Sequence, residues 1–164
     1  MEYVDYSRYI ALYGDIEVSV FQRLLIKATR IIDYHTTGCD GYAKLKNAYP
    51  TEVGAVNAVQ YCVCELINAM YHDETALMII EQANSFSKRE DGTYQPNKVS
   101  SLSSGAESVS FSTSANSIDT GITDRAKRES NYREIVTECL RGVLDANGVN
   151  LLYMGVYPIC TKKQ

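Results

Sequence analysis

The residues that could do chemistry are few and lie far apart. The two histidines, His35 and His72, share no HxH or HExxH spacing, and we expect each near a helix end, capping it or contacting water. Five cysteines are present without a CxxC motif, and Cys62 and Cys64, two positions apart, would point to different sides of a helix. The sequence therefore predicts reduced, partly buried thiols and no zinc site. The cysteines are Cys39, Cys62, Cys64, Cys139 and Cys160.

Catalytic arrangements are not apparent either. Acidic residues such as Asp33, Asp40 and Glu65 occur singly, and a nucleophile needs a base and an orienting acid close to it. No GxSxG motif and no glycine-rich phosphate loop occurs. A helix-turn-helix needs a basic recognition helix, but no Lys or Arg occurs between Thr51 and Ser87. We expect a protein that is not an enzyme and needs no cofactor.

Length and charge narrow the class of protein further. A chain of 164 residues with 45% hydrophobic and 22% charged residues is typical of one globular domain, with or without appendages. A net charge of −4 argues against broad binding to nucleic-acid phosphates. No apolar run approaches the roughly eighteen residues of a membrane span, and the start, MEYVDYSRY, lacks a secretory pattern. The cytoplasm is the expected compartment.

Apolar residues recur at helical spacing in most of the chain. The first segment, VDYSRYIALYGD, predicts a helix that stops at Gly14. Longer helices are predicted for Glu17–Thr36, from a cap at Thr51 through HDETALMIIEQANSF, and for Thr123–Asp145. The fold class is therefore mainly α, a small helical bundle with a β-like arm protruding in mid-chain and an extended C-terminal tail.

Two local features of these helices can be predicted from turn and cap residues. Asp15 or Ser19 is expected to cap the second helix, since Ser19 and Gln22 have the spacing of a capping box. Two glycines in TTGCDGY break that helix, and Gly38 to Pro50 is expected to form a loop.

The serine-rich stretch SSLSSGAESVSFSTSANS forms the predicted arm. Val109 and Phe111 alternate with serines, as in a strand with one apolar face. Such a strand needs a partner alongside, and a lone two-stranded hairpin is marginal in water, so we expect the partner to come from another chain. The alternative is a flexible surface loop.

The closing stretch, VNLLYMGVYPICTKKQ, is apolar and β-favouring, and Gly155 and Pro158 disfavour a helix. It is too apolar to lie in solvent. We expect an extended tail that docks on another protein, and the alternative is that it folds back on its own core.

The order of these landmarks resembles the head–tail connector, or adaptor, proteins of long-tailed bacteriophages and related prophages. The resemblance runs along nearly the whole chain and rests on Tyr13-Gly14, FQRLLIKATRIIDYHTTG, AVQYCVCELINAMY, SSGAESVSFS and LLYMGV. The chain departs from the family in the arm, where the family often has a glycine pair, and at Met154, where it has a basic residue.

The resemblance implies a homo-oligomeric ring, typically of twelve copies, docked beneath the portal protein in the neck of the virion. Subunits would assemble in the host cytoplasm, bind each other, the portal and the next neck or tail protein, and let DNA pass through as non-specific cargo. The implied portal-binding residues are Leu151, Leu152, Tyr153, Gly155, Val156 and Tyr157. The implied inter-subunit arm is Glu107, Ser108, Val109, Ser110, Phe111 and Ser112.

The predicted organisation has four parts. Residues 1–97 are the first part of the helical core, 98–120 the arm, 121–147 the last core helix and 148–164 the tail. Two alternatives stay open for the function: another neck component, such as a stopper or tail-completion protein, which would be richer in strands, or a non-viral helical binding module, for which both extensions would be dispensable.

Overall fold

The fold is mainly helical, as predicted. The computed structural model describes residues 3–83, 86–88, 94–96, 101–104, 107–110 and 125–158. The chain divides into two compact units, Met1–Tyr71 with Glu129–Gln164 and His72–Arg128. The helices are α1 (Tyr6–Tyr13), α2 (Val18–Thr36), α3 (Lys44–Asn47), α4 (Val53–Ala83) and α5 (Arg125–Cys139), and the strands are β1 (Phe86–Lys88), β2 (Tyr94–Pro96), β3 (Ser101–Ser104) and β4 (Glu107–Ser110).

The ends of α1 follow from local residue chemistry. The Asp5 carboxylate caps α1 by accepting a hydrogen bond from the backbone N–H of Arg8 at 2.8 Å. Gly14 ends the helix at a φ of +90°, a conformation that other residues rarely adopt, which confirms the predicted stop.

The predicted cap of α2 is wrong, because the residue before this helix is Glu17. Ser19 lies inside the first turn, and its hydroxyl donates to the Glu17 carboxylate at 2.6 Å. The Asp15 carboxylate instead accepts a hydrogen bond from the hydroxyl of Tyr6 at 2.5 Å.

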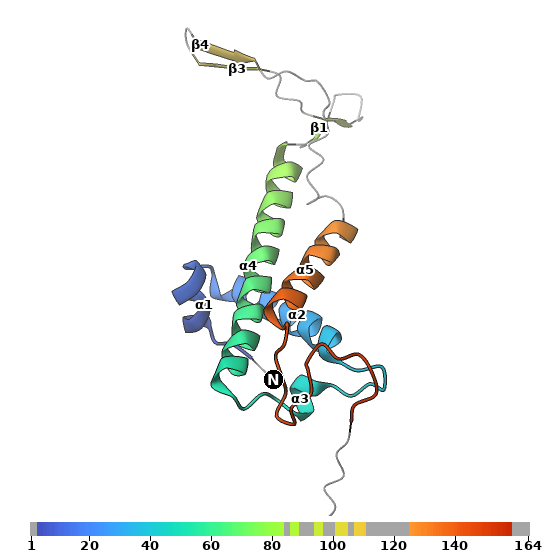
Figure 1. Cartoon of the computed structure of the whole chain (residues 1–164). Helices are drawn as coiled ribbons and strands as arrows, with labels where there is room; N and C mark the ends of the chain where they lie inside the picture. Colours follow the sequence, from blue (N-terminus) through green and yellow to red (C-terminus); the bar gives the residue numbers. More distant parts are fainter. Residues whose placement is uncertain are drawn as a thin grey trace, which may run out of the picture. The chain divides into compact units, whose positions relative to one another are not determined.

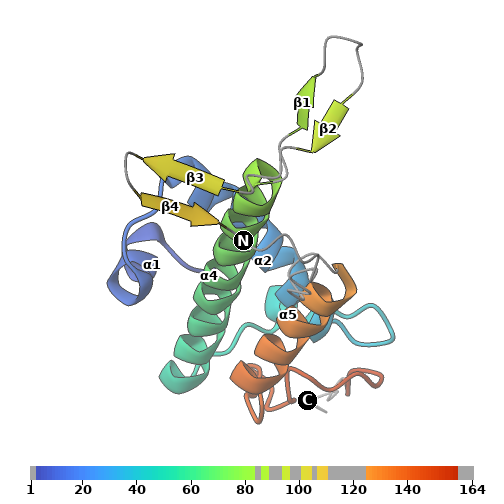
Figure 2. The same cartoon turned by 90° about the horizontal axis from the view of Figure 1, so that it is seen from above.

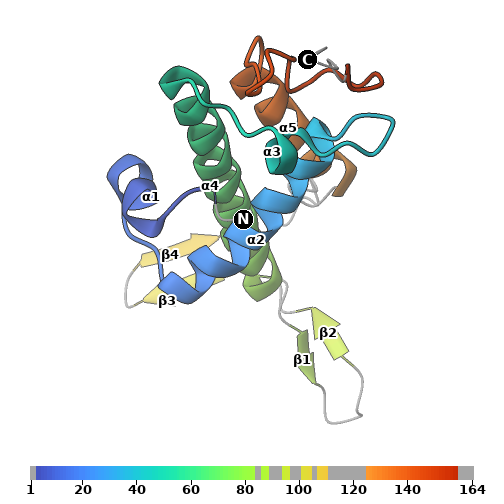
Figure 3. The ribbon, with the colours of Figure 1, turned by 90° about the horizontal axis from the view of Figure 1, so that it is seen from below.

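The core of the first unit lies where α2 crosses α4. In the views of Figures 1, 2 and 3, α1 lies on one side of α4 and α5 lies on the other. The apolar stripe predicted for α2 is buried, and each fully buried side chain of this kind stabilises the fold by about 1.5–3 kcal/mol. The central residues are Leu24, Leu25, Ala28 and Ile32 of α2, Val59, Val63, Leu66 and Ile67 of α4, and Val136 of α5.

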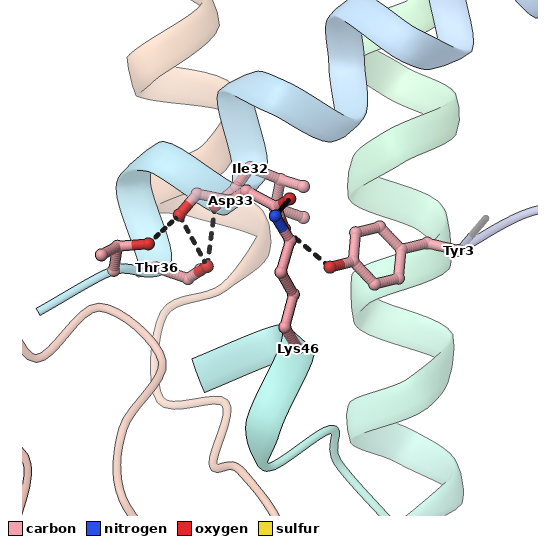
Figure 4. Close-up of polar contacts among 6 residues, drawn as sticks. Tyr3, Ile32, Asp33, Thr36 and Lys46 are labelled. Atoms are coloured by element: carbon pink, nitrogen blue, oxygen red, sulfur yellow. Dashed lines mark hydrogen bonds and ion pairs between the residues drawn. The ribbon is translucent and has the colours of Figure 1, made fainter. Parts of the chain in front are cut away.

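The segment predicted as a loop between Gly38 and Pro50 contains a single helical turn, α3. It packs on α2 through Leu45, which is 1% exposed. Asp33 of α2 receives a hydrogen bond from the Tyr3 hydroxyl at 2.6 Å and pairs with the Lys46 ammonium of α3 at 3.1 Å (Figure 4). One carboxylate therefore joins the start of the chain, α2 and α3.

Helix α4 is one continuous helix from Val53 to Ala83, as the apolar spacing predicted. The prediction that no apolar run approaches a membrane span is wrong for this helix, because its stretch Val53–Met78 is long and apolar enough to cross a membrane. In that stretch, 44% of the qualifying window is buried inside the protein. Cys62, Val63 and Ile67 in this stretch are completely buried. The buried residues of α4 therefore belong to the hydrophobic core of the first unit.

Helix α5 is shorter than predicted. It ends at Cys139 rather than near Asp145, and Leu140 and Arg141 lead into a turn with Gly142 at a φ of +76°. Leu140 is nevertheless fully buried, so the apolar periodicity that suggested a longer helix reflects core contacts beyond the helix end.

The second unit contains two antiparallel hairpins, β1 with β2 and β3 with β4. In the β3–β4 hairpin, Ser101 pairs with Ser110 and Leu102 pairs with Val109. The arm residues Glu107–Ser110 are therefore extended and pair with Ser101–Ser104 of the same chain. Phe111 and Ser112 lie outside the described residues.

Candidate docking surface

The C-terminal loop, residues 145–158, begins with a tight turn in the sequence DANG. The Asp145 carboxylate accepts hydrogen bonds from the backbone N–H groups of Asn147 and Val149, each at 2.9 Å. Gly148 adopts a φ of +78° in this turn. The backbone N–H of Leu151 then donates to the Val143 carbonyl at 2.9 Å, which starts the return of the chain toward the core.

The expectation of a free, extended tail is wrong for the part of it that reaches Pro158. Leu151 is completely buried and Tyr157 is 5% exposed, while Leu152 is partly buried against the core. These large apolar side chains find partners on their own helices, so the fold-back alternative is correct here. Residues 159–164 lie outside the described residues.

Tyr157 fixes the far end of the loop through three kinds of contact. Its backbone N–H donates to the Asp40 carboxylate at 2.8 Å, and its hydroxyl donates to the Asp145 carboxylate at 2.5 Å. Its ring stacks on Tyr42 with centroids 4.0 Å apart. Burial, together with the bond to Asp145, raises the pKa of Tyr157 to about 12, and the backbone N–H groups of Tyr157 and Tyr42 lower the pKa of Asp40.

The middle of the loop is held against the segment after α2. The backbone N–H of Cys39 donates to the Met154 carbonyl at 3.0 Å. A Cβ atom at Gly38 would lie 2.9 Å from the Gly155 carbonyl oxygen and 2.7 Å from the Asp40 carboxylate. Glycine at position 38 therefore permits the two backbones to approach each other.

We predict that Gly38→Ala lowers the free energy of unfolding by about 1–3 kcal/mol, because the Gly155 backbone must move away from the new methyl group. Urea denaturation followed by circular dichroism measures this change. Gly54→Ala is the matched control: a Cβ at this position of α4 meets only the Glu52 carboxylate at 3.5 Å, and alanine favours the helix. Equal stability of Gly38→Ala and the wild type would contradict the close contact.

Between the buried ends of the loop, three neighbouring apolar side chains lie in solvent. Tyr153 is 48% exposed, Met154 is 53% exposed and Val156 is 67% exposed. We call these three residues the exposed strip. Of the residues predicted to bind a partner, Tyr153 and Val156 are therefore available, Gly155 is half-buried, and Leu151 and Tyr157 serve the core.

The predicted site residues fall into two groups. The C-terminal residues lie together in one loop of the first unit, whereas Glu107–Ser110 belong to the second unit. Sequence reasoning missed three residues that shape the loop: Asp40, Lys44 and Asp145. The turn chemistry of DANG was a signal for Asp145, but nothing distinguished Asp40 or Lys44 from residues of a solvated loop.

The thiols are distributed between core and surface. Cys62 and Cys64 are buried, Cys139 is half-buried and Cys39 is exposed. Burial raises the pKa of Cys64 to about 11. Within the described ranges, no three His, Cys, Asp or Glu side chains gather in a way that could hold a metal ion.

Taken together, the C-terminal loop can offer an apolar contact of fixed shape, since its ends are buried and its middle is exposed. Function must be inferred from these residues and their geometry, because no model of a known protein family, no curated protein and no solved structure matches the chain.

Proposed function

We propose that this protein is a structural, non-enzymatic virion protein: a subunit of the head–tail connector ring that docks beneath the portal and links the capsid to the tail. The order of sequence landmarks along nearly the whole chain supports this proposal. The mainly helical fold favours an adaptor over a stopper or tail-completion protein, which would be richer in strands.

The observation that supports the proposal most is the exposed strip. Tyr153, Met154 and Val156 are apolar side chains held out by a loop whose flanking residues are buried. A loop with a fixed conformation loses little conformational entropy when a partner binds. The strip is small, so each copy would bind weakly, but simultaneous contacts around a ring would multiply the affinity. The proposed partner of the strip is an apolar pocket on the portal protein.

A closed ring also needs a second, unlike surface on each subunit, because its contacts are heterologous. We assign this role to the arm, Glu107–Ser112, whose described part is the strand β4. A two-stranded hairpin has open edges with unpaired backbone groups that a neighbouring chain can extend. The net charge of −4 fits a channel through which DNA must slide without adhering.

The proposal predicts that the triple variant Tyr153→Ala, Met154→Ala, Val156→Ala loses most of its binding to the portal protein of the same virion. The three truncations remove exposed apolar area and leave buried Leu151 and Tyr157 in place, so circular dichroism should be unchanged. Copurification of coexpressed, differently tagged proteins measures the binding.

The matched control replaces three exposed apolar residues elsewhere in the first unit with alanine: Leu12, Val18 and Ile26, which are 46%, 48% and 57% exposed. This variant should bind the portal as the wild type does. Unchanged binding of the strip variant would refute the assignment of the strip. Failure of the wild type to bind the portal would favour a non-viral binding module.

A further inference from the structure

Lys44, the first residue of α3, is a completely buried cation. Its ammonium group donates to the carbonyl oxygens of Thr36 at 3.0 Å, Leu151 at 3.1 Å and Tyr153 at 2.5 Å. An ammonium group has three N–H donors, so these three acceptors satisfy it completely. The acceptors come from two segments more than a hundred residues apart in the sequence.

Each acceptor suits a buried positive charge. Thr36 is the last residue of α2, and the carbonyl groups at a helix C-terminus lack intrahelical partners and carry partial negative charge. The Leu151 and Tyr153 carbonyls belong to the C-terminal loop. Burial lowers the pKa of Lys44, while the charges of Asp145 and Asp40 oppose this shift. The carboxylates of Asp145 and Asp40 therefore help to keep the Lys44 ammonium group charged.

We infer that Lys44 is the positioning residue of the exposed strip. Its bonds to the Leu151 and Tyr153 carbonyls lie at the start of the strip, and its bond to Thr36 ties both to the rigid end of α2. Two further hydrogen bonds hold the rest of the loop, one between Cys39 and Met154 and one between Asp40 and Tyr157. Both start from the segment between α2 and Lys44, and the bond from Lys44 to Thr36 closes this segment against the end of α2. The docking role of the strip rests on the proposed function, whereas the hydrogen bonds by which Lys44 holds the loop do not depend on it.

The role of Lys44 differs from that of Lys46, two residues later. The Lys46 side chain is 56% exposed, and its ammonium group pairs with the Asp33 carboxylate of α2 (Figure 4). Because the ammonium end of this ion pair lies largely in solvent, the pair contributes little to stability. Lys46→Met is therefore a matched control for Lys44→Met, because both changes remove one ammonium from the same helical turn.

Hydrogen exchange measured by mass spectrometry at neutral pH tests the inference without a partner protein. In Lys44→Met, we expect the loop amides of Leu151 and Tyr157 and the amide of Cys39 to exchange at least about tenfold faster, since a charged hydrogen-bond network is lost. Amides of α2 and of α4 up to Tyr71 should exchange as in the wild type, and Lys46→Met should change none of them. Wild-type protection of the loop in Lys44→Met, or loss of the whole helical core, would overturn the loop-specific role.

A second measurement uses the unmodified chain. An ammonium group whose protons are all hydrogen-bonded and buried exchanges them slowly, so Lys44 should give a resolved ¹H–¹⁵Nζ signal in NMR spectra. The signal should disappear in Lys44→Met and stay in Lys46→Met. Its absence from the wild type would refute the three-carbonyl site.

Portal copurification completes the test. Lys44→Met should weaken portal binding at least about tenfold, because the strip then loses its fixed conformation. If the loop loosens and portal binding stays unchanged, Lys44 does not position a docking surface. If the wild type shows a protected loop and no portal binding, the proposed function fails while the structural role of Lys44 stands.

Discussion

Ending the chain at Asn150 is expected to unfold the first unit. The truncation removes Leu151 and Tyr157 from the core, and each buried side chain contributes about 1.5–3 kcal/mol. It also leaves the buried Lys44 ammonium without two of its three acceptors, at a further cost of about 1–3 kcal/mol. The sum is comparable to the roughly 5–15 kcal/mol by which a native domain is stable. Circular dichroism and urea denaturation measure the loss.

Ending the chain at Pro158 is the control, because it retains every described contact of the C-terminal loop. This shorter truncation should keep the urea midpoint of the full-length chain. A chain ending at Asn150 with an unchanged midpoint would show that the loop is not part of the core. In that case residues 151–164 would form the extended tail that the sequence predicted.

The second large effect is expected in alkaline solution. Burial and carboxylate partners raise the pKa of several tyrosines of the first unit above 10 in the folded state, and that of Tyr157 to about 12. A raised folded pKa means that the stability from such a group is fully present below pH 10 and is lost as the pH rises through the folded value. The tyrosines concerned are Tyr3, Tyr6, Tyr9, Tyr13, Tyr49 and Tyr157.

Lys44 acts in the opposite direction. Its folded pKa lies below the ordinary value of 10.5, so folding releases its proton more readily and the contribution of Lys44 rises with pH in this range. Six tyrosines with raised folded pKa values outweigh one lysine with a lowered one. The buried Cys64 thiol, whose folded pKa is about 11, adds a loss that begins near pH 9. The free energy of unfolding should therefore begin to fall above pH 9 and fall steeply between pH 10 and pH 12.

Urea denaturation at a series of pH values, with tyrosinate absorbance recorded in parallel, checks this prediction. Tyr157→Phe removes one titrating group, so its stability should be lower at neutral pH, through the lost bond to Asp145, but should fall less between pH 10 and pH 12. A midpoint that stays level up to pH 12 would mean that these hydroxyl groups are accessible to solvent.

The helices could be predicted from the sequence because their apolar spacing is strong. The stripe of Phe21, Leu24 and Ala28 matches the buried face of α2, and Gly14 ends α1 as expected. Helix ends were less predictable: the stripe through Leu140 continued past the end of α5, because Leu140 packs into the core from a turn. The spacing of apolar residues indicates which side chains are buried, and buried side chains can continue beyond the last residue of a helix.

The C-terminal loop shows why the site was only partly predictable. Its apolar residues correctly indicated that the segment cannot lie in solvent, but whether Leu151 contacts its own core or another protein depends on contacts far apart in sequence. Asp40 and Lys44 make these contacts through hydrogen bonds to Tyr157 and Leu151. The residues that surround them in the sequence are typical of a solvated loop. The functions of the exposed strip and of the arm remain predictions, since they concern other chains.

Lys44 is hydrogen-bonded to Leu151 and Tyr153, which follow it by 107 and 109 positions in the sequence. This separation has a consequence for the order in which the chain folds during its synthesis on the ribosome. Until Leu151 and Tyr153 have left the ribosome, a nascent chain lacks two of the three acceptors of the Lys44 ammonium group. Contacts between such distant residues form late and slowly. The first unit is thus completed only after the C-terminal loop has been synthesised, so a nascent chain that lacks this loop has no exposed strip.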